Sequence, residues 1–281
     1  MIYLRLLRRE FRRLQQQVHY RRWSLQDMPI LFCNSFPKRG THLLTQILGG
    51  FMQLGAVVES GLPAVVTFNS INGEQRPESQ ILEDLKRFKP ADIGYGHLHA
   101  TQAIMNWLCR DGVIPYFILR DPRDVVVSHV HYITNMASTH IHHRYYTEGL
   151  HSFEDRLRIS ILGRDTSFPS IADRFLPFVN WMEKNEVLTL RYEEFLRDRR
   201  TTLRKVIDHA LQRGFVLSAN TSMDQAVIFL EQAINPQRSP TFRQGKARVW
   251  KDAFTPESTA LFKDIASDLL IRLGYEKDNN W

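Results

Sequence analysis

The stretch Ile30-Leu-Phe-Cys-Asn-Ser-Phe-Pro-Lys-Arg-Gly-Thr-His-Leu-Leu44 determines the fold class of this chain. Its mostly apolar beginning predicts a buried strand over residues 30–35. A tight turn containing Lys38 and Gly40 follows, and then a helix over residues 41–54. Such a junction points backbone N–H groups and the positive end of a helix dipole at one place, where an anion binds. The turn is not a Walker A loop, because Gly-x-x-x-x-Gly-Lys-Ser/Thr occurs nowhere in the chain.

A second stretch, Tyr116-Phe-Ile-Leu-Arg-Asp-Pro-Arg-Asp-Val-Val-Val-Ser128, has the same order. A strand over residues 114–119 is apolar on both faces, which indicates an interior position in a parallel sheet. Pro122 suits the first turn of a helix that continues to Thr134. Arg120 follows the strand, where open α/β sheets bind ligands, and Ser128 lies about two helical turns further on. Both are candidate anion ligands.

Strands and helices alternate along the rest of the chain. Further strands are predicted over 93–98 and 187–191, and further helices over 78–88, 101–109, 168–184, 193–212, 223–234 and 256–273. This alternation predicts a single α/β domain with a central parallel β-sheet flanked by helices. Residues 136–168, rich in His, Arg and Tyr, are expected to be irregular, and the polar, basic residues 235–254 are typical of a functional lid loop.

The motifs resemble those of a known family. Pro37-Lys-Arg-Gly-Thr41 and Arg120–Ser128 resemble the two donor-binding motifs of cytosolic-type sulfotransferases that use 3′-phosphoadenosine-5′-phosphosulfate (PAPS). Phe242-Arg-Gln-Gly-Lys-Ala-Arg-Val-Trp-Lys-Asp-Ala-Phe-Thr255 resembles the family's Arg-Lys-Gly…Trp-Lys…Phe-Thr segment. The three motifs have the family's order and spacing between about Pro29 and about Tyr275. The resemblance implies a P-loop-like phosphosulfate-binding turn at 37–41.

The resemblance also implies the residues that bind PAPS. Lys38 would stabilise the leaving phosphate oxygen, because charge develops there as the sulfuryl group departs. The 5′-phosphate would be held by the backbone amides of Arg39, Gly40, Thr41 and His42, with the Thr41 hydroxyl. The 3′-phosphate would be held by Arg120 and Ser128, with Arg243 and Gly245 reaching it from the lid loop.

The adenine site departs from the family pattern. Tyr192 and the segment Thr221, Ser222, Met223 resemble its adenine-binding residues, but Met223 replaces the usual Phe. Leu43 stands where a Trp often stacks on the base, which predicts weaker stacking. Gln244 replaces the usual Lys and removes one phosphate cation, for which Lys246 is a candidate substitute.

An acceptor hydroxyl or amine must lose a proton during transfer. His97, in Gly94-Tyr-Gly-His-Leu-His99, matches the position of the family's catalytic histidine, and an imidazole suits a general base at neutral pH. His99 is the competitor, on the same strand face if the strand continues. His140, His142 and His143 look like metal ligands, but they have no cysteine or acidic motif beside them and the family's chemistry uses no metal. We expect a histidine-rich acceptor loop and no metal.

The positive charge is concentrated in one segment. Residues 1–28 hold seven arginines and two acids, a net +5 of the chain's +7, and we expect a basic amphipathic extension there, followed by the sulfotransferase domain over 29–281. A nucleic-acid-binding protein more often spreads its basic surface over the folded domain, so no nucleic acid is expected. In residues 1–24, Leu4, Leu7, Phe11, Leu14 and Val18 fall on one helical stripe. Peripheral contact with an anionic membrane and packing on the domain both remain open.

The sequence also supports expectations about the cellular compartment and the binding partners of the protein. The only cysteines, Cys33 and Cys109, are expected to be buried thiols. The arginines near Met1 interrupt any secretory signal. We therefore expect a cytoplasmic protein, which is associated with a membrane if residues 1–24 bind lipid. No apolar run approaches the ~20 residues of a membrane-spanning helix. The acceptor is expected to be a small molecule, a lipid or a sugar. The sequence carries no signal for an oligomeric state.

The predicted function is therefore transfer of a sulfuryl group from PAPS by in-line displacement, with His97 as the general base. Two alternatives stay open. One is another nucleotide-dependent transferase, such as a kinase, although the Walker A sequence is missing. The other is a non-catalytic peripheral membrane or regulatory binding protein that retains the fold, which the departures at Leu43 and Gln244 leave possible.

Overall fold

The computed structural model describes residues 2–37, 41–69, 73–238 and 245–281. The chain forms two compact units. The sheet unit comprises residues 1–67, 76–119 and 181–239, and the helical unit comprises residues 68–75, 120–180 and 240–281.

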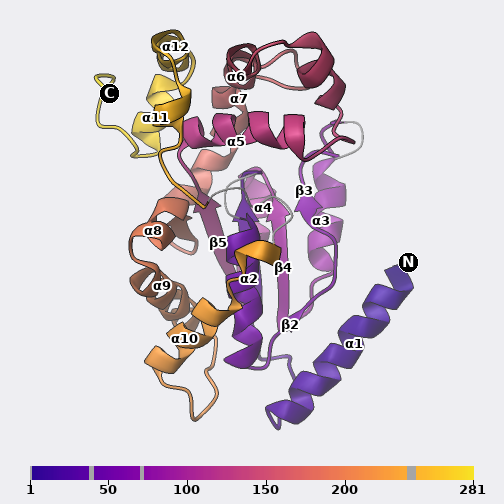
Figure 1. Cartoon of the computed structure of the whole chain (residues 1–281). Helices are drawn as coiled ribbons and strands as arrows, with labels where there is room; N and C mark the ends of the chain where they lie inside the picture. Colours follow the sequence, from indigo (N-terminus) through magenta and orange to yellow (C-terminus); the bar gives the residue numbers. More distant parts are fainter. Residues whose placement is uncertain (1, 38–40, 70–72, 239–244) are drawn as a thin grey trace. The chain divides into compact units, whose positions relative to one another are not determined.

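The sheet unit contains a parallel sheet (Figure 1). Its strands are β1 (Ile30–Ser35), β2 (Val58–Glu59), β3 (Val65–Val66), β4 (Asp92–His97), β5 (Val113–Leu119) and β6 (Leu188–Arg191). Their order is β2-β4-β1-β5-β6, with β3 also paired to β4. Every residue of β1 and β5 is buried, as expected for interior strands of a parallel sheet. The predicted α/β fold and the interior position of β5 are confirmed.

The helices of the sheet unit follow the predicted alternation. They are α1 (Ile2–His19), α2 (Thr41–Gly50), α3 (Glu78–Lys86), α4 (Gln102–Leu108), α8 (Tyr192–Arg197), α9 (Arg199–Gln212) and α10 (Met223–Ala233), with 3₁₀ turns at Phe51–Gln53 and Pro236–Arg238. The helix predicted over 193–212 is two helices, because Asp198 leaves the helical conformation and its side chain accepts the Thr201 N–H at the start of α9.

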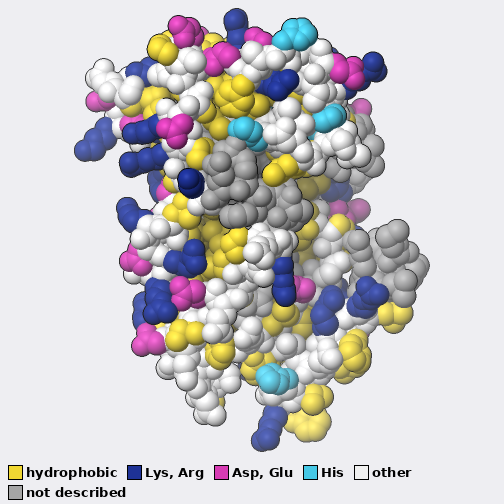
Figure 2. All heavy atoms as spheres, viewed as in Figure 1, with side chains coloured by type: hydrophobic (Ala, Val, Ile, Leu, Met, Phe, Trp, Pro, Cys, Tyr) yellow, Lys and Arg dark blue, Asp and Glu magenta, His cyan; other side chains and the backbone are white. Residues whose placement is uncertain are grey.

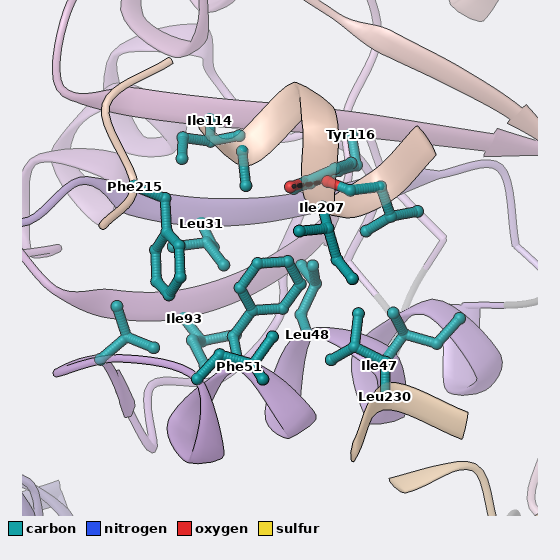
Figure 3. Packing of buried hydrophobic residues seen from close by; sticks show 14 of the residues in the cluster. Leu31, Ile47, Leu48, Phe51, Ile93, Ile114, Tyr116, Ile207, Phe215 and Leu230 are labelled. Carbon is teal, nitrogen blue, oxygen red and sulfur yellow. Dashed lines mark hydrogen bonds between the residues drawn. The ribbon is translucent and has the colours of Figure 1, made fainter. Parts of the chain in front are cut away.

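The core of the sheet unit lies where α2 and α9 pack on the sheet and α10 packs on these two helices (Figure 3). Phe51 and Phe215 meet edge to face with ring centroids 5.0 Å apart. The fully buried Leu31, Ile114 and Tyr116 come from β1 and β5. Burial of each such side chain stabilises the fold by roughly 1.5–3 kcal/mol. This core fixes α2 and the ends of the strands, on which the candidate site depends.

The helical unit contains α5 (Pro122–Asn135), a π-helical turn (Tyr145–Gly149), α6 (Phe153–Leu162), α7 (Ile171–Val179), α11 (Trp250–Ala253) and α12 (Pro256–Arg272). The expectation that residues 136–168 are irregular was wrong for α6. The start of α6 is fixed by a capping box, in which Ser152 accepts the Asp155 N–H and Asp155 accepts the Ser152 N–H. The helix predicted over 168–184 is α7 followed by a 3₁₀ turn at Asn180–Glu183.

Helix α1 packs on the sheet unit through its arginines. Arg9 and Arg13 form ion pairs with Asp92, the first residue of β4. Tyr20, just after the helix, donates a hydrogen bond to the Met52 carbonyl at 2.9 Å. None of the helices in the described ranges is both long and apolar enough to span a bilayer.

Candidate active site

Five predicted site residues, Lys38, Arg39, Gly40, Arg243 and Gln244, lie outside the residues that the structure describes. The other predicted residues form two groups. One lies in the sheet unit and includes His97, and the other lies in the helical unit and includes Arg120.

His97 is the last residue of β4, and its ring is held by the end of β1. Its Nδ1 atom lies 2.9 Å from the backbone carbonyl oxygen of Ser35 and 3.2 Å from the Ser35 hydroxyl. The Ser35 hydroxyl lies 2.6 Å from that of Thr41, the first residue of α2. The parallel register, with Asn34 opposite Gly96, places the two strand ends side by side. The predicted base and the predicted phosphate ligand Thr41 thus share one hydrogen-bond network.

The partner of Nδ1 assigns the tautomer of His97. A carbonyl oxygen can only accept, so Nδ1 carries the hydrogen and donates it to Ser35. In the neutral ring the lone pair is then on Nε2. Nε2 is therefore the atom of His97 that can take a proton from an acceptor group.

The residues on either side of His97 are also fixed. Asn34 is buried within β1 and forms two hydrogen bonds with the backbone of Leu98, at 3.0 and 2.9 Å. The Trp181 indole N–H donates to the same Leu98 carbonyl at 2.8 Å. Any side chain at Gly96 would overlap the Val65 carbonyl, so β3 approaches β4 closely only because this residue is glycine. These contacts restrict the backbone that carries the imidazole.

His99 is less suited to be the base. β4 ends at His97, so His99 does not continue the strand face. Its backbone N–H donates to the Thr67 hydroxyl at 3.0 Å. Burial lowers the pKa of His99 to about 4, which makes it a weaker proton acceptor than an ordinary histidine.

The predicted nucleotide ligands of the sheet unit begin helices. Thr41 begins α2 and is buried, while His42 is exposed. Tyr192 begins α8 and is half-buried. The half-buried Thr221 donates its N–H to the Ser218 carbonyl at 3.0 Å. Ser222 caps α10, since its hydroxyl accepts the Gln225 N–H at 3.3 Å.

The two apolar residues that replace aromatic residues of the family's adenine site have a structural role in the sheet unit. Leu43 on α2 and Met223 at the start of α10 are partly buried and pack against the core. A packed, apolar surface therefore exists at both positions. Hydrophobic contact with a base would be retained there, without the stacking that an aromatic ring provides.

In the helical unit, Arg120 is oriented by a buried carboxylate. Its Nη2 atom lies 3.2 Å from Asp124 Oδ2 and donates to the Lys246 carbonyl at 2.7 Å. Asp124 is fully buried and also accepts the backbone N–H groups of Arg248 and Trp250, at 2.9 and 3.1 Å. Burial raises the pKa of the Asp124 carboxyl, while the charge of Arg120 opposes that shift. Asp124 thus ties Arg120 to residues 246–250.

Asp124 links Arg120 to the face of α5 that carries Ser128. Asp124 and Ser128 are four residues apart on α5, and Arg120, which precedes the helix, lies 3.2 Å from Asp124. Ser128 is half-buried. Gly245, which begins the segment carrying Lys246, has a φ of 61°, a conformation that favours glycine. These residues remain candidates for binding a phosphate.

Arg123 has a different role from Arg120. It forms ion pairs with Asp121 at 2.7 Å and Glu276 at 2.6 Å. Its guanidinium lies 4.0 Å from the centre of the Trp250 ring and 4.5 Å from that of Trp281. Arg123 therefore fixes the segment after residue 246 through Trp250.

The histidine-rich loop is built into the helical unit. His143 Nδ1 lies 2.6 Å from the Ile133 carbonyl, and the His142 ring packs on Phe168 at 4.9 Å between centroids. Within the ranges that the structure describes, no group of three or more His, Cys, Asp or Glu side chains is placed to hold a metal ion.

Some residues of the site were not identified from the sequence. Ser35 contacts the His97 ring, and Asn34 and Trp181 form hydrogen bonds with the backbone of Leu98. The position of Ser35 at the carboxyl end of an apolar strand was an available signal, because ligands bind at that edge of a parallel sheet. A polar Asn inside an otherwise apolar strand was a second one.

Comparison with known proteins identifies the family. A family model described as "Sulfotransferase domain" matches residues 116–274, more than half of the chain. The fold is similar to that of mouse sulfotransferase SULT7A1 complexed with PAP, with 19% identity and a TM-score of 0.56, covering 87% of this chain and 84% of that chain. It is also similar to retinol dehydratase in a complex with retinol and PAP, with 18% identity and a TM-score of 0.57, covering 88% and 83%. The chain therefore belongs to the sulfotransferase domain family.

Proposed function

We propose that this chain transfers the sulfuryl group of PAPS to a hydroxyl or amine of an acceptor, with His97 as the general base. The observation that carries the proposal is the hydrogen bond from His97 Nδ1 to the Ser35 carbonyl. It leaves the basic lone pair of the neutral ring on Nε2 and holds the ring in one orientation.

The reaction is an in-line displacement at sulfur. The acceptor oxygen or nitrogen forms a bond to sulfur while the bond from sulfur to the bridging phosphate oxygen breaks. His97 Nε2 takes the acceptor proton, and 3′,5′-adenosine bisphosphate (PAP) leaves. Lys38, whose role here rests on the family motif, would stabilise the negative charge on the departing oxygen.

The family motifs supply separate ligands for the two phosphates of the donor. The start of α2, with the backbone amides of residues 39–42 and the Thr41 hydroxyl, would bind the 5′-phosphate, because a helix N-terminus favours an anion. Arg120, oriented by Asp124, would bind the 3′-phosphate with Ser128 and Gly245.

The remaining donor ligands rest on the family motifs. Arg243 would add a cation at the 3′-phosphate, and Gln244 would add only a neutral side chain. Lys246 is exposed and close in sequence, so it is the candidate cation in place of the family's lysine. Tyr192 and residues 221–223 would form the adenine site. We propose that no metal takes part.

The acceptor is proposed to be a small molecule, a lipid or a sugar. The similar retinol dehydratase structures contain retinol or androsterone, which are apolar molecules that carry a hydroxyl group. A histidine that accepts a proton at Nε2 is suited to remove the proton of a hydroxyl or an amine. Hydroxyl-bearing apolar compounds are therefore the first acceptors to screen.

Turnover tests the catalytic assignment. PAP release from PAPS would be followed with a panel of phenols, aliphatic alcohols, sugars and amines, for the wild type, His97→Gln and His99→Gln. We expect His97→Gln to lower kcat by roughly 10²–10⁴-fold, the usual contribution of a general base, while PAP affinity is retained. The exposed His19→Gln is the control. A His97→Gln enzyme with wild-type kcat would contradict the assignment, and loss of kcat in His99→Gln alone would transfer the role to His99.

A further inference from the structure

Helix α1 exposes its apolar face. Leu7, Phe11, Leu14 and Val18 recur at helical spacing, and their side chains are 67%, 63%, 60% and 78% exposed. A helix on a protein surface normally turns such a stripe toward the core. Figure 2 shows apolar side chains along the outer side of α1, with basic side chains around them.

The opposite, polar face of α1 is the buried one. Arg9 is 2% exposed and pairs with Asp92, which is itself fully buried. Arg13 lies 3.3 Å from the same carboxylate and donates to the Pro90 carbonyl at 2.7 Å. The Lys89 backbone N–H also donates to Asp92, at 2.8 Å. Removing one partner of a buried ion pair is costly, so these contacts hold the helix with its apolar stripe outward.

The charges around the stripe are basic. Arg8 and Arg21 are exposed. Glu10, the acid on the helix, is paired with Lys89 at 2.8 Å. Residues 1–28 carry a net charge of +5. An exposed apolar stripe flanked by arginines is complementary to a surface that is both apolar and anionic.

Trp23 extends this surface beyond the helix. It is the most exposed large apolar side chain among the described residues, at 101% of its reference area. The Trp23 carbonyl accepts a hydrogen bond from the Gln17 side chain at 3.0 Å, so the segment after the helix is tied back to it. Tryptophan is favoured at the boundary between lipid headgroups and hydrocarbon.

We propose that the outward stripe of α1, formed by Leu7, Phe11, Leu14, Val18 and Trp23, binds the surface of an anionic lipid bilayer. The helix would lie parallel to the membrane plane, with the stripe among the acyl chains and the arginines at the headgroups. A second copy of the chain fits less well, because a symmetric contact through this stripe would bring Arg8 and Arg21 near their own copies. This inference does not depend on the transferase reaction.

Vesicle co-sedimentation tests the proposal with the full chain. Vesicles would be made of phosphatidylcholine alone or mixed with phosphatidylserine. The double variant Phe11→Ser/Leu14→Ser shortens two exposed side chains of the stripe and leaves Arg9, Arg13 and Asp92 in place. The control, Val216→Ser/Ile228→Ser, changes two exposed apolar residues elsewhere in the sheet unit, which are 53% and 40% exposed. Thermal unfolding confirms that each variant is folded.

We expect the wild type to bind the phosphatidylserine vesicles at least about tenfold more tightly than the neutral ones, with binding that weakens as salt is added. The stripe variant should lose roughly tenfold or more in affinity, and the control variant should match the wild type. Absence of wild-type binding to anionic vesicles, or equal binding by the stripe variant, would overturn the proposal. A wild-type dimer that the stripe variant converts to a monomer, with no vesicle binding, would assign the stripe to self-association instead.

Discussion

The Nδ1 atom of His97 lies 2.9 Å from the backbone carbonyl oxygen of Ser35, so the last residue of β1 orients the ring at the end of β4. A backbone carbonyl cannot be removed by mutation, and its position is set by the strand pairing itself. The orientation of the proposed base is therefore as rigid as the centre of the sheet. This relationship explains why the residues that support the strand ends should influence turnover.

Asn34 is the first such residue. Replacing it by Ala would leave the Leu98 N–H without its acceptor in a buried position, at a cost of about 1–3 kcal/mol of stability. The backbone next to His97 would be less restricted, and we expect kcat to fall several-fold while PAP affinity stays within about twofold of the wild type. Chemical denaturation, calorimetry and turnover measure the three quantities. The exposed Asn106→Ala is the control, and a fall in PAP affinity that matches the fall in kcat would contradict a positioning role for Asn34.

Asp124 should act on donor binding through Arg120. Asp124→Asn keeps the shape of the side chain but removes the negative charge that orients the guanidinium. We expect PAP affinity to fall by roughly threefold to tenfold in calorimetry, since hydrogen bonds to charged groups contribute about 1.5–3 kcal/mol and part of the contact remains.

A double-mutant cycle separates this effect from general destabilisation. If Asp124 acts through Arg120, Asp124→Asn should have little further effect on PAP affinity in an Arg120→Ala background. Asp121→Asn is the matched control, because Asp121 caps α5 and forms an ion pair with Arg123. Fully additive effects of Asp124→Asn and Arg120→Ala would contradict the coupling.

The close packing of α2 against α10 should make the fold sensitive to a side chain at Gly50. A Cβ atom there would lie 2.8 Å from Leu230 Cδ2 and 3.0 Å from Ala233 Cβ. We expect Gly50→Ala to destabilise the fold by about 1–3 kcal/mol, measured by urea denaturation. The neighbouring Gly49→Ala is the control, because its Cβ would meet its nearest atom, Glu59 Oε1, at 3.6 Å. Equal stability of the two variants would show that the contact between α2 and α10 is looser than described.

Two half-buried histidines should make stability depend on pH. Burial lowers the pKa of both His99 and His209 from 6.5 to about 4. The folded state therefore favours the neutral rings, and their stabilising effect is complete above pH 6.5 and is lost as the pH falls toward about 4. Denaturation between pH 7 and pH 4 should show a shallower loss of stability in His99→Gln and in His209→Gln than in the wild type. An unchanged slope in both variants would contradict the shifts, and His19→Gln provides the exposed control.

The sequence predicted the strands that carry the site. β5 is apolar along its whole length and β1 is apolar up to Cys33, and buried parallel strands have that pattern. Arg120 was identified because it follows β5, and His97 was identified because it matches the position of the family's catalytic histidine. β2 and β3 were not predicted, because two residues each are too short to show a periodicity.

The supporting contacts were less accessible from the sequence. Ser35 holds His97 mainly through a backbone carbonyl, which every residue type possesses. Asp124 lies within the Arg120–Ser128 motif, but the motif does not show which groups its carboxylate contacts. Its hydrogen bonds to the backbone of Arg248 and Trp250 join segments more than a hundred residues apart, and only the fold brings them together.

The most direct test of the central claim, that PAPS is the donor, is calorimetric binding of PAP to the wild type and to Arg120→Ala. We expect micromolar binding by the wild type and at least about tenfold weaker binding by Arg120→Ala, with the exposed Arg200→Ala as an unaffected control. Binding of ATP but not PAP would favour a kinase-like transferase. No binding of PAP by the wild type would contradict the account and support a non-catalytic protein that retains the fold.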